Sequence, residues 1–356
     1  GRSRQGLIEK HRVIVCTGSG GVGKTTTSAA LGIAAAKMGK RVLVLTIDPA
    51  RRLATSLGIE NCSADVRVPG QTFAGELYAG MIDPQRTFED YVERHSHSPA
   101  AAQRLFDTVL YQQLSTTLAG SQEFTSLARL HEAASSGKYD LVILDTPPAA
   151  HAVDFLLAPE KLNAVFDSTI VSLFMGRSSG FGFAASAWKQ GMKMILATLT
   201  YLTGSEFVGN FTHFFAAIDE LAPAIRQTNL QAQKLLLDPT TAFVLISSFD
   251  AAKIQEGEAF HDQLSAAGYH LRKVIVNRAW PQWSQGSDSE HAAVQSALRS
   301  GKAHDLAALH EDLQAYYSAR GTLHTRFNDI LSVPEMDGEM IGLPALERLA
   351  KLLVAT

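Results

Sequence analysis

The amino-acid sequence predicts an α/β fold: a doubly wound, mostly parallel sheet with a phosphate-binding loop, and a helical subdomain inserted between strands. Three observations support this fold class. Short apolar runs rich in β-branched residues alternate with helical stretches along the 356-residue chain, which is the order of a doubly wound sheet. A glycine-rich loop separates the first apolar run from the first long helix. Two long segments with apolar residues three and four positions apart interrupt the alternation.

The predicted strands are apolar runs bounded by turn residues, as expected of strands that are buried on both faces. They cover residues 12–16, 41–47, 77–82, 141–144, 242–247 and 274–276. Helices are predicted over 24–38 and 251–267, because glycines at positions 39 and 268 can close them in the left-handed conformation. A last helix is predicted over 343–354.

The loop after the first predicted strand reads Gly-Ser-Gly-Gly-Val-Gly-Lys-Thr over residues 18–25. This spacing is typical of a phosphate-binding loop, in which backbone N–H groups close around a phosphate and the helix N-terminus adds partial positive charge. Lys24 is predicted to neutralise the β- and γ-phosphates, and Thr25 to ligate Mg²⁺ through its hydroxyl. The residues predicted to bind nucleotide here are Gly20, Gly21, Val22, Gly23, Lys24, Thr25 and Thr26.

Two aspartates follow predicted strands at the carboxyl edge of the sheet, where open α/β sheets carry their reactive groups. Asp48 is predicted to orient the attacking water. Asp145 is predicted to hold Mg²⁺, usually through water, together with Thr25. For either aspartate taken alone, capping a helix is as good an explanation as a catalytic role. Three such elements in this order favour catalysis, with Lys24, Asp48 and Asp145 as the catalytic residues.

Three segments carry a family resemblance: GSGGVGKTTT from residue 18, TIDPARRL from residue 46 and LDTPPAAHAVDFLLAP from residue 144. They resemble the ArsA-type ATPases, a branch of the deviant phosphate-loop class that also contains the targeting factor for tail-anchored membrane proteins. The resemblance implies an enzyme that hydrolyses ATP with Mg²⁺. It also implies a dimer that ATP closes and hydrolysis reopens.

The resemblance further assigns roles to individual residues. Residues 145–151 would form the second switch, and Asp48 would belong to the first. Asn277 would hydrogen-bond adenine, while the segment around Pro334 would close over the base. A turn residue that ends a strand is the alternative interpretation of Asn277.

The expected domain organisation is a nucleotide-binding core interrupted twice. The core comprises residues 11–83, residues 137–158 with the second switch, and residues 238–356. A helical insertion covers 84–136, and a helical subdomain covers 159–237.

The chain departs from the family pattern at Ser19, where a lysine normally reaches across the dimer to the partner's nucleotide and adds positive charge. Serine supplies a hydrogen bond but no charge. Three explanations stay open: Arg51 or Arg52 replaces the cation, a paralogous subunit brings the lysine, or ATP turnover is slow. Either arginine is also explained as an ordinary surface residue. The predicted assembly is therefore a homodimer or a heterodimer with a paralogous ATPase.

Cysteine usage separates the chain from some of its relatives. Cys16 and Cys62 are the only cysteines, which excludes a disulfide framework, clustered arsenite-binding thiolates and a C-x-x-C zinc clasp. The same usage favours a reducing cytoplasm. Because the sequence begins at Gly1 instead of methionine, a targeting segment ahead of it is left open.

Residues 166–215 concentrate phenylalanine and methionine, which suits an adaptable groove for a hydrophobic client. A buried core or a dimer interface explains this composition equally well. The amphipathic segment 343–353 could lie on a membrane, but its apolar spacing favours packing on the core. A net charge of −3 and no apolar run of membrane-spanning length predict no nucleic-acid partner and at most transient membrane association.

The sequence therefore predicts a cytoplasmic ATP hydrolase with ATP and Mg²⁺ as cofactors. Its nucleotide-driven dimer opening and closing would switch the binding of a hydrophobic client or a protein partner. One alternative is a regulatory subunit of a heteromeric ATPase with a lysine-bearing paralogue. Another is the motor subunit of an anion efflux pump, which would need an oxyanion site and a membrane channel.

Overall fold

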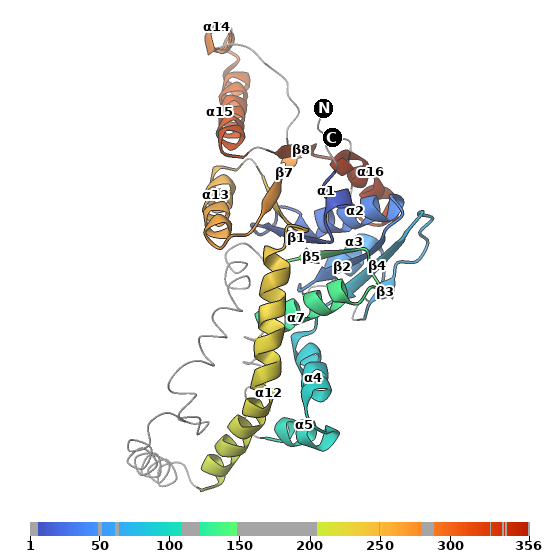
Figure 1. Cartoon of the computed structure of the whole chain (residues 1–356). Helices are drawn as coiled ribbons and strands as arrows, with labels where there is room; N and C mark the ends of the chain where they lie inside the picture. Colours follow the sequence, from blue (N-terminus) through green and yellow to red (C-terminus); the bar gives the residue numbers. More distant parts are fainter. Residues whose placement is uncertain are drawn as a thin grey trace. The chain divides into compact units, whose positions relative to one another are not determined.

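The computed structural model describes residues 6–48, 52–60, 64–108, 111, 122–147, 205–248, 250–279, 288–327, 329–336, 338 and 340–354. Within these residues it confirms the predicted fold class (Figure 1). Eight strands form one sheet in the order β3-β4-β2-β5-β1-β6-β7-β8. All neighbouring strands are parallel except the pair β3 and β4.

The strands are β1 (Val13–Gly18), β2 (Arg41–Thr46), β3 (Val66–Arg67), β4 (Glu76–Met81), β5 (Leu141–Asp145), β6 (Thr241–Ser247), β7 (Leu271–Ala279) and β8 (Ile330–Pro334). All six predicted strands are confirmed. Sequence analysis missed β3 and β8. The first has only two residues, and the second alternates buried and partly exposed positions, so neither gives a continuous apolar run.

Contacts between Cα atoms divide the chain into two compact units. The sheet unit comprises Gly1–Met81, Ala133–Val153 and Leu237–Thr356, and the helical unit comprises Ile82–Glu132 and Asp154–Leu236. The domain boundaries expected from sequence stay predictions. Most of the predicted helical subdomain, including the apolar segment 166–204, lies outside the described residues.

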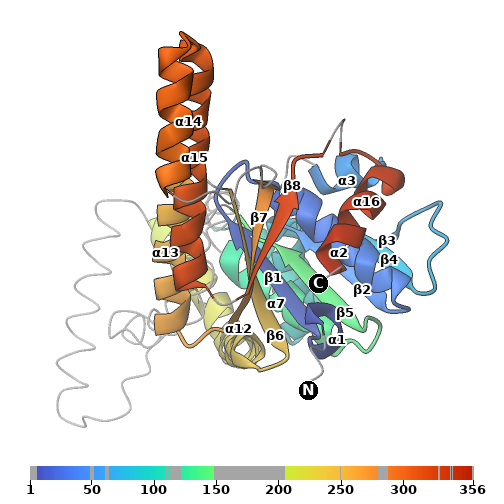
Figure 2. The ribbon, with the colours of Figure 1, turned by 90° about the horizontal axis from the view of Figure 1, so that it is seen from above.

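Helices accompany the sheet within the sheet unit, some packed on its strands and some on other helices. They are α1 (Leu7–Lys10), α2 (Lys24–Lys37), α3 (Arg52–Leu57), α13 (Ala251–Ala266), α14 (Asp288–Ser300), α15 (His304–Arg326) and α16 (Leu343–Val354). Helix α2 contacts β1, β2, β4 and β5, whereas α13 contacts β6 and β7. Figure 2 shows α2, α3 and α16 grouped together, and α14 running beside α15.

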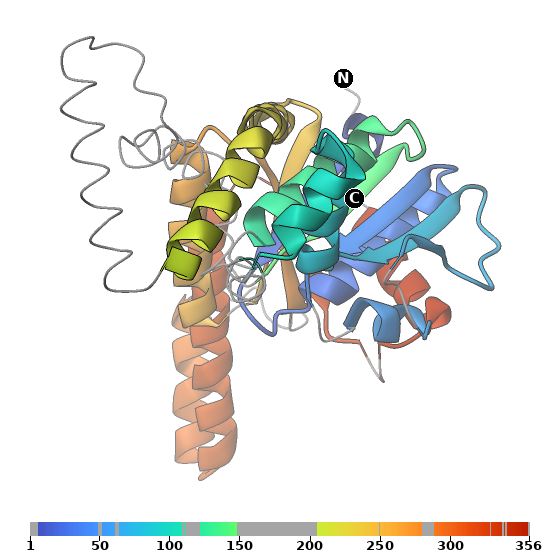
Figure 3. The ribbon, with the colours of Figure 1, turned by 90° about the horizontal axis from the view of Figure 1, so that it is seen from below.

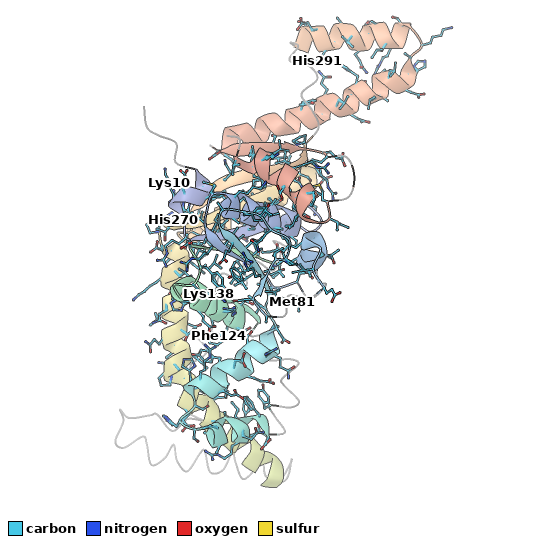
Figure 4. All side chains as sticks on the ribbon, turned by 90° about the vertical axis from the view of Figure 1, so that its right-hand side faces the viewer. Lys10, Met81, Phe124, Lys138, His270 and His291 are labelled. Carbon is cyan, nitrogen blue, oxygen red and sulfur yellow. The ribbon has the colours of Figure 1, made fainter. Side chains whose placement is uncertain are left out.

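The helical unit has its own apolar core. Its described helices are α4 (Pro84–His95), α5 (Pro99–Phe106), and the parts of α7 (Gln122–Ser135) and α12 (Ser205–Leu237) that precede Ala133 and Leu237 (Figure 3). Buried aromatic and aliphatic side chains pack together there, namely Tyr91, Val92, Leu105, Phe124, Phe214 and Leu221. Phe124 is labelled among the side chains in Figure 4. This core gives the helical unit its own hydrophobic stabilisation.

The C-terminal helix α16 packs on α2, which confirms that the segment 343–353 faces the core. Its apolar stripe of Leu346, Leu349 and Leu353 is buried in the same cluster as the side chains of α2. Glu347 adds an ion pair to Lys37 of α2. No helix among the described residues is long and apolar enough to cross a membrane.

Truncating this stripe should destabilise the sheet unit. Leu346→Ala is expected to lower the free energy of unfolding by about 2–5 kcal/mol, because it removes buried methyl groups and leaves a cavity. Val354→Ala on the same helix is the control, since Val354 is 48% exposed. It should change stability by less than about 0.5 kcal/mol. Urea unfolding followed by circular dichroism measures both, and equal effects would contradict the packing of α16.

Candidate functional site

The loop between β1 and α2 is shaped by two glycines, one at a close backbone approach and one in the left-handed conformation. Gly18 pairs with Ile246 of β6 and has φ 151°, and a Cβ there would lie 2.0 Å from the Ile246 carbonyl oxygen. Gly23 has φ 90° at the N-cap of α2, and its Cβ would lie 2.4 Å from Nδ2 of Asn277. A larger residue at Gly18 would collide with the backbone of β6, and any side chain at Gly23 would strain the backbone because of its positive φ.

Lys24, the first residue of α2, folds back over this loop. Its ammonium donates a hydrogen bond to the Ser19 carbonyl oxygen at 3.0 Å. Burial lowers the pKa of Lys24, whereas the negative charge of Asp145 acts in the opposite direction. A buried ammonium at a helix N-terminus is well placed to attract a phosphate.

Asp145 ends β5, which lies between β1 and β2 in the sheet. The strand register sets Cys16 and Thr46 beside it. Its side chain is almost completely buried, and Oδ2 accepts hydrogen bonds from the hydroxyls of Thr25 at 2.6 Å and Thr46 at 3.1 Å. Burial raises the pKa of Asp145 to about 6. The structure therefore places Thr25 and Asp145, both predicted Mg²⁺ ligands, in direct contact.

The other carboxylate oxygen of Asp145 indicates what the site can hold. Oδ1 is buried and has no hydrogen-bond partner among the described residues. An acceptor in this state is costly, because it has lost water without gaining a donor. A hydrated divalent cation would satisfy it, since carboxylate and hydroxyl oxygens are the ligands that Mg²⁺ prefers. The donor set of Thr25 and Asp145 therefore fits Mg²⁺.

Thr46 is a site residue that sequence analysis missed. Its hydroxyl donates to Asp145 and accepts the backbone N–H of Asp48 at 3.2 Å, so it joins the ends of β2 and β5. Its sequence signal was a lone polar residue at the end of an apolar strand. The partner of that residue depends on the register between β2 and β5, which sequence alone does not give.

Asp48 lies near this cluster. Its charge raises the pKa values of both Lys24 and Asp145, although for each of these groups burial is the largest influence. Arg52 forms an ion pair with Asp48 at 3.3 Å, and the Arg52 side chain is 69% exposed. Arg51, the other candidate cation, lies outside the described residues, as do residues 148–151 of the expected second switch.

The two residues expected to contact the adenine base lie on neighbouring strands. Asn277 of β7 donates through its side-chain amide to the Val22 carbonyl oxygen at 2.9 Å, so it contacts the phosphate loop. Pro334 ends β8 opposite Ala279 of β7. The adenine-binding role of Asn277 and the closing role of the Pro334 segment stay predictions.

The remaining predicted nucleotide-binding residues surround Lys24. Gly20 and Gly21 are exposed in the loop, whereas Val22 is buried. Thr26 lies in the first turn of α2 and is partly buried. The loop therefore combines exposed glycine backbone with a buried lysine.

The chain is similar to known ATPases over nearly its whole length. The family model described as anion-transporting ATPase, ArsA, matches residues 11–355. The protein named ATPase GET3 from Malassezia globosa is 24% identical over an alignment of 348 positions that covers 96% of this chain and 90% of that protein. The ATPase get3 of Aspergillus niger is 26% identical over an alignment of 347 positions that covers 96% of this chain and 90% of that protein. The ATPase get3 of Aspergillus terreus is 26% identical over an alignment of 358 positions, gaps included, that covers 99% of this chain and 94% of that protein.

The family match spans both the sheet unit and the helical unit and includes the phosphate loop, Asp145 and Asn277. It confirms the resemblance found in the sequence, and with it ATP as the nucleotide. This chain therefore belongs to the ArsA family of anion-transporting ATPases.

Proposed function

We propose that this ATPase hydrolyses ATP with Mg²⁺ and uses the cycle to open and close a dimer. The two states would bind a hydrophobic client or a protein partner differently. The main support is the convergence of Lys24, Thr25 and Asp145 at one loop, where a buried carboxylate oxygen lacks a donor among the described residues. The family match supports the ATPase activity.

Lys24 and the loop backbone would bind the phosphates. The ammonium can exchange the neutral Ser19 carbonyl for anionic phosphate oxygens, which are stronger acceptors for a charged donor. The glycine backbone at positions 20, 21 and 23 would supply N–H donors. Val22, Thr25 and Thr26 complete the proposed phosphate-binding set.

Thr25 and Asp145 would hold Mg²⁺, which when bound neutralises negative charge on the phosphate oxygens. Asp145 must be ionised for this role, and the metal's own charge favours the ionised form. Asp48 would orient the attacking water, because its backbone N–H donates to the Thr46 hydroxyl, which itself contacts Asp145. Asn277 and Pro334 are proposed to contact adenine and to close over it.

The identity of the partner subunit stays open between a second copy and a paralogous ATPase. A regulatory heteromeric ATPase is therefore the second candidate function. An anion efflux motor agrees with the name of the family, but the one described cysteine does not support soft-anion binding. Burial raises the pKa of Cys16 to about 12, so its thiol stays protonated and inert. A cytoplasmic location also stays a prediction.

Removing the Lys24 ammonium should abolish turnover. Lys24→Ala is expected to lower ATP hydrolysis by on the order of 10²-fold or more, because phosphate charge is no longer neutralised in the transition state. Phosphate release measures turnover, and a fluorescent ATP analogue measures binding. Lys351→Ala, an exposed change on α16, is the control. Unchanged hydrolysis by Lys24→Ala would falsify the proposed site.

The pH dependence of stability should report the buried Asp145. Its folded pKa of about 6 lies above the ordinary 3.8, so the folded chain holds a proton that the unfolded chain releases between these values. The stabilisation from this group is full below about pH 4 and is lost as the pH rises through about 6. Without nucleotide or Mg²⁺, Asp145→Asn should therefore be more stable than wild type at pH 7.5, by roughly 1–3 kcal/mol.

Urea unfolding at pH 4, 5, 6 and 7.5 measures this difference. The advantage of Asp145→Asn should shrink toward pH 4, where the wild-type carboxyl is also neutral. Mg²⁺-dependent ATP turnover should be lost in the same variant. A stability difference that stays constant with pH would contradict a raised pKa for Asp145.

The assembly state should depend on nucleotide. Mass photometry with ATP and Mg²⁺ is expected to show a species of twice the 38.4 kDa chain mass, and Lys24→Ala should not form it. A wild-type chain that hydrolyses ATP as a monomer would contradict the dimer. A monomer that binds ATP without hydrolysing it would favour a paralogous partner subunit over self-association.

A further inference from the structure

The side chain of Asn277 reaches the phosphate loop from a strand that is not adjacent to it. In the sheet order β6 lies between β1 and β7, and the three strands are parallel. Gly18 at the end of β1 pairs with Ile246, and the next residue of β6, Ser247, pairs with Val276. Asn277 follows Val276 and therefore stands at the level where β1 has already turned into the loop.

The contact between Asn277 and the loop is a directed hydrogen bond. Its side-chain Nδ2 donates to the carbonyl oxygen of Val22 at 2.9 Å, across 255 positions of sequence. Because the acceptor is a carbonyl oxygen, only the nitrogen end of the amide can face it. The same nitrogen lies so close to Gly23 that a Cβ on that glycine would be 2.4 Å away. One amide therefore lies against two consecutive residues of the loop.

This distant amide acts at the point where the loop becomes helix α2. Gly23 is the N-cap residue, and because it has no side chain it cannot accept the first backbone N–H groups of the helix. Its left-handed backbone, with φ 90°, belongs to the residue type with the widest choice of conformations. Holding the Val22 carbonyl therefore restrains the most adaptable part of the loop, directly before Lys24.

Strand β7 is irregular at the point where it supplies this amide. Its pairing with β8 shifts between Val276, which pairs with Ser332, and Ala279, which pairs with Pro334. Over this interval β7 uses one residue more than β8, which is the pattern of a β-bulge. Arg278 inside the bulge has φ 53°, a left-handed conformation that is unfavourable for a residue with a side chain. Bulges re-aim side chains, and strained backbone of this kind is typical of functional sites.

We propose that Asn277 is a positioning residue for the phosphate loop and that the bulge in β7 aims it there. This inference deepens the proposed ATP binding and rests on it. A side-chain amide has two N–H donors and one carbonyl acceptor, and the bond to Val22 uses one donor. The second donor and the oxygen form the pair with which asparagine bonds adenine. The same side chain would then join the base to the loop that binds the phosphates.

This role differs from binding the base alone. A residue that only contacts adenine stabilises the ground state and the transition state equally, so its loss raises KM and leaves kcat unchanged. A residue that places the loop also places its N–H groups and Lys24, where charge develops during phosphoryl transfer. Its loss therefore lowers kcat. It also weakens the binding of phosphate ligands that carry no base.

The first test removes the amide while keeping its shape. Asn277→Leu is nearly isosteric but cannot donate, and Asn277→Ala replaces it if leucine disturbs the fold. Either variant is expected to lower kcat for ATP by about three- to tenfold, the range for one lost hydrogen bond. The dissociation constant of inorganic triphosphate with Mg²⁺, measured by displacement of a fluorescent ATP analogue, should rise by a similar factor. Gln263→Leu, which removes an exposed amide from α13, is the matched control.

Hydrogen–deuterium exchange observes the loop without any ligand. In Asn277→Leu the backbone amides of residues 19–26 should exchange faster than in wild type, because the carbonyl that anchors the loop is released. Peptides from β2 should exchange at the wild-type rate, which establishes that the sheet unit stays folded.

Two variants of Arg278 test the bulge. Both Arg278→Asn and Arg278→Val remove the charge, but asparagine tolerates a left-handed backbone, whereas the branched side chain of valine does not. Arg278→Val should speed the exchange of the loop as Asn277→Leu does, and Arg278→Asn should not. Equal exchange in the two variants would overturn the role of the bulge.

Two results would overturn the role of Asn277. One is a raised KM for ATP with unchanged kcat and unchanged binding of inorganic triphosphate, which is the result of a base contact alone. The other is loop exchange in Asn277→Leu that matches wild type. A wild-type chain without ATP turnover would instead contradict the proposed function. The exchange measurement needs no ligand, so it would still decide the role of Asn277.

Discussion

The buried carboxylate of Asp145 is the constraint on which the site depends. It sits at the end of β5, between β1 and β2, where both flanking strands are themselves buried. A charge in this position is unfavourable unless donors surround it. Thr25 and Thr46 supply two of them to one oxygen. The register of β1, β2 and β5 therefore decides where the phosphate loop can begin and which side chains meet next to it.

The loop is fixed from both sides by strands that are distant in sequence. Gly18 lies against the backbone of β6, and Asn277 of β7 holds the Val22 carbonyl oxygen. Thr46 joins β2 to β5 beneath the loop. Because four strand ends contribute, small errors in sheet packing would displace the phosphate-binding groups together. The apolar layer of α2 and α16 thus supports the site by keeping the sheet rigid.

Sequence alone predicted the local parts of this arrangement and missed the contacts that depend on register. Lys24, Thr25 and Asp145 were predictable because a glycine-rich loop and an apolar strand are continuous in sequence. The strand β8 was missed because its half-buried alternation gives a weak apolar signal. Thr46 was missed for another reason. Its partner Asp145 lies 99 positions away, and only the folded sheet brings the two together.

The electrostatics of the site favour a ligand that carries both signs of charge. Burial lowers the pKa of Lys24 and raises that of Asp145, so it disfavours the charged form of each group. An anion alone would relieve Lys24 but would oppose ionisation of Asp145. A cation alone would do the reverse. A complex of Mg²⁺ with a nucleoside triphosphate would relieve both, because its phosphates carry charge opposite to the ammonium and its metal carries charge opposite to the carboxylate. The unfavourable burial of two opposite charges therefore favours the metal–nucleotide complex over either of its parts.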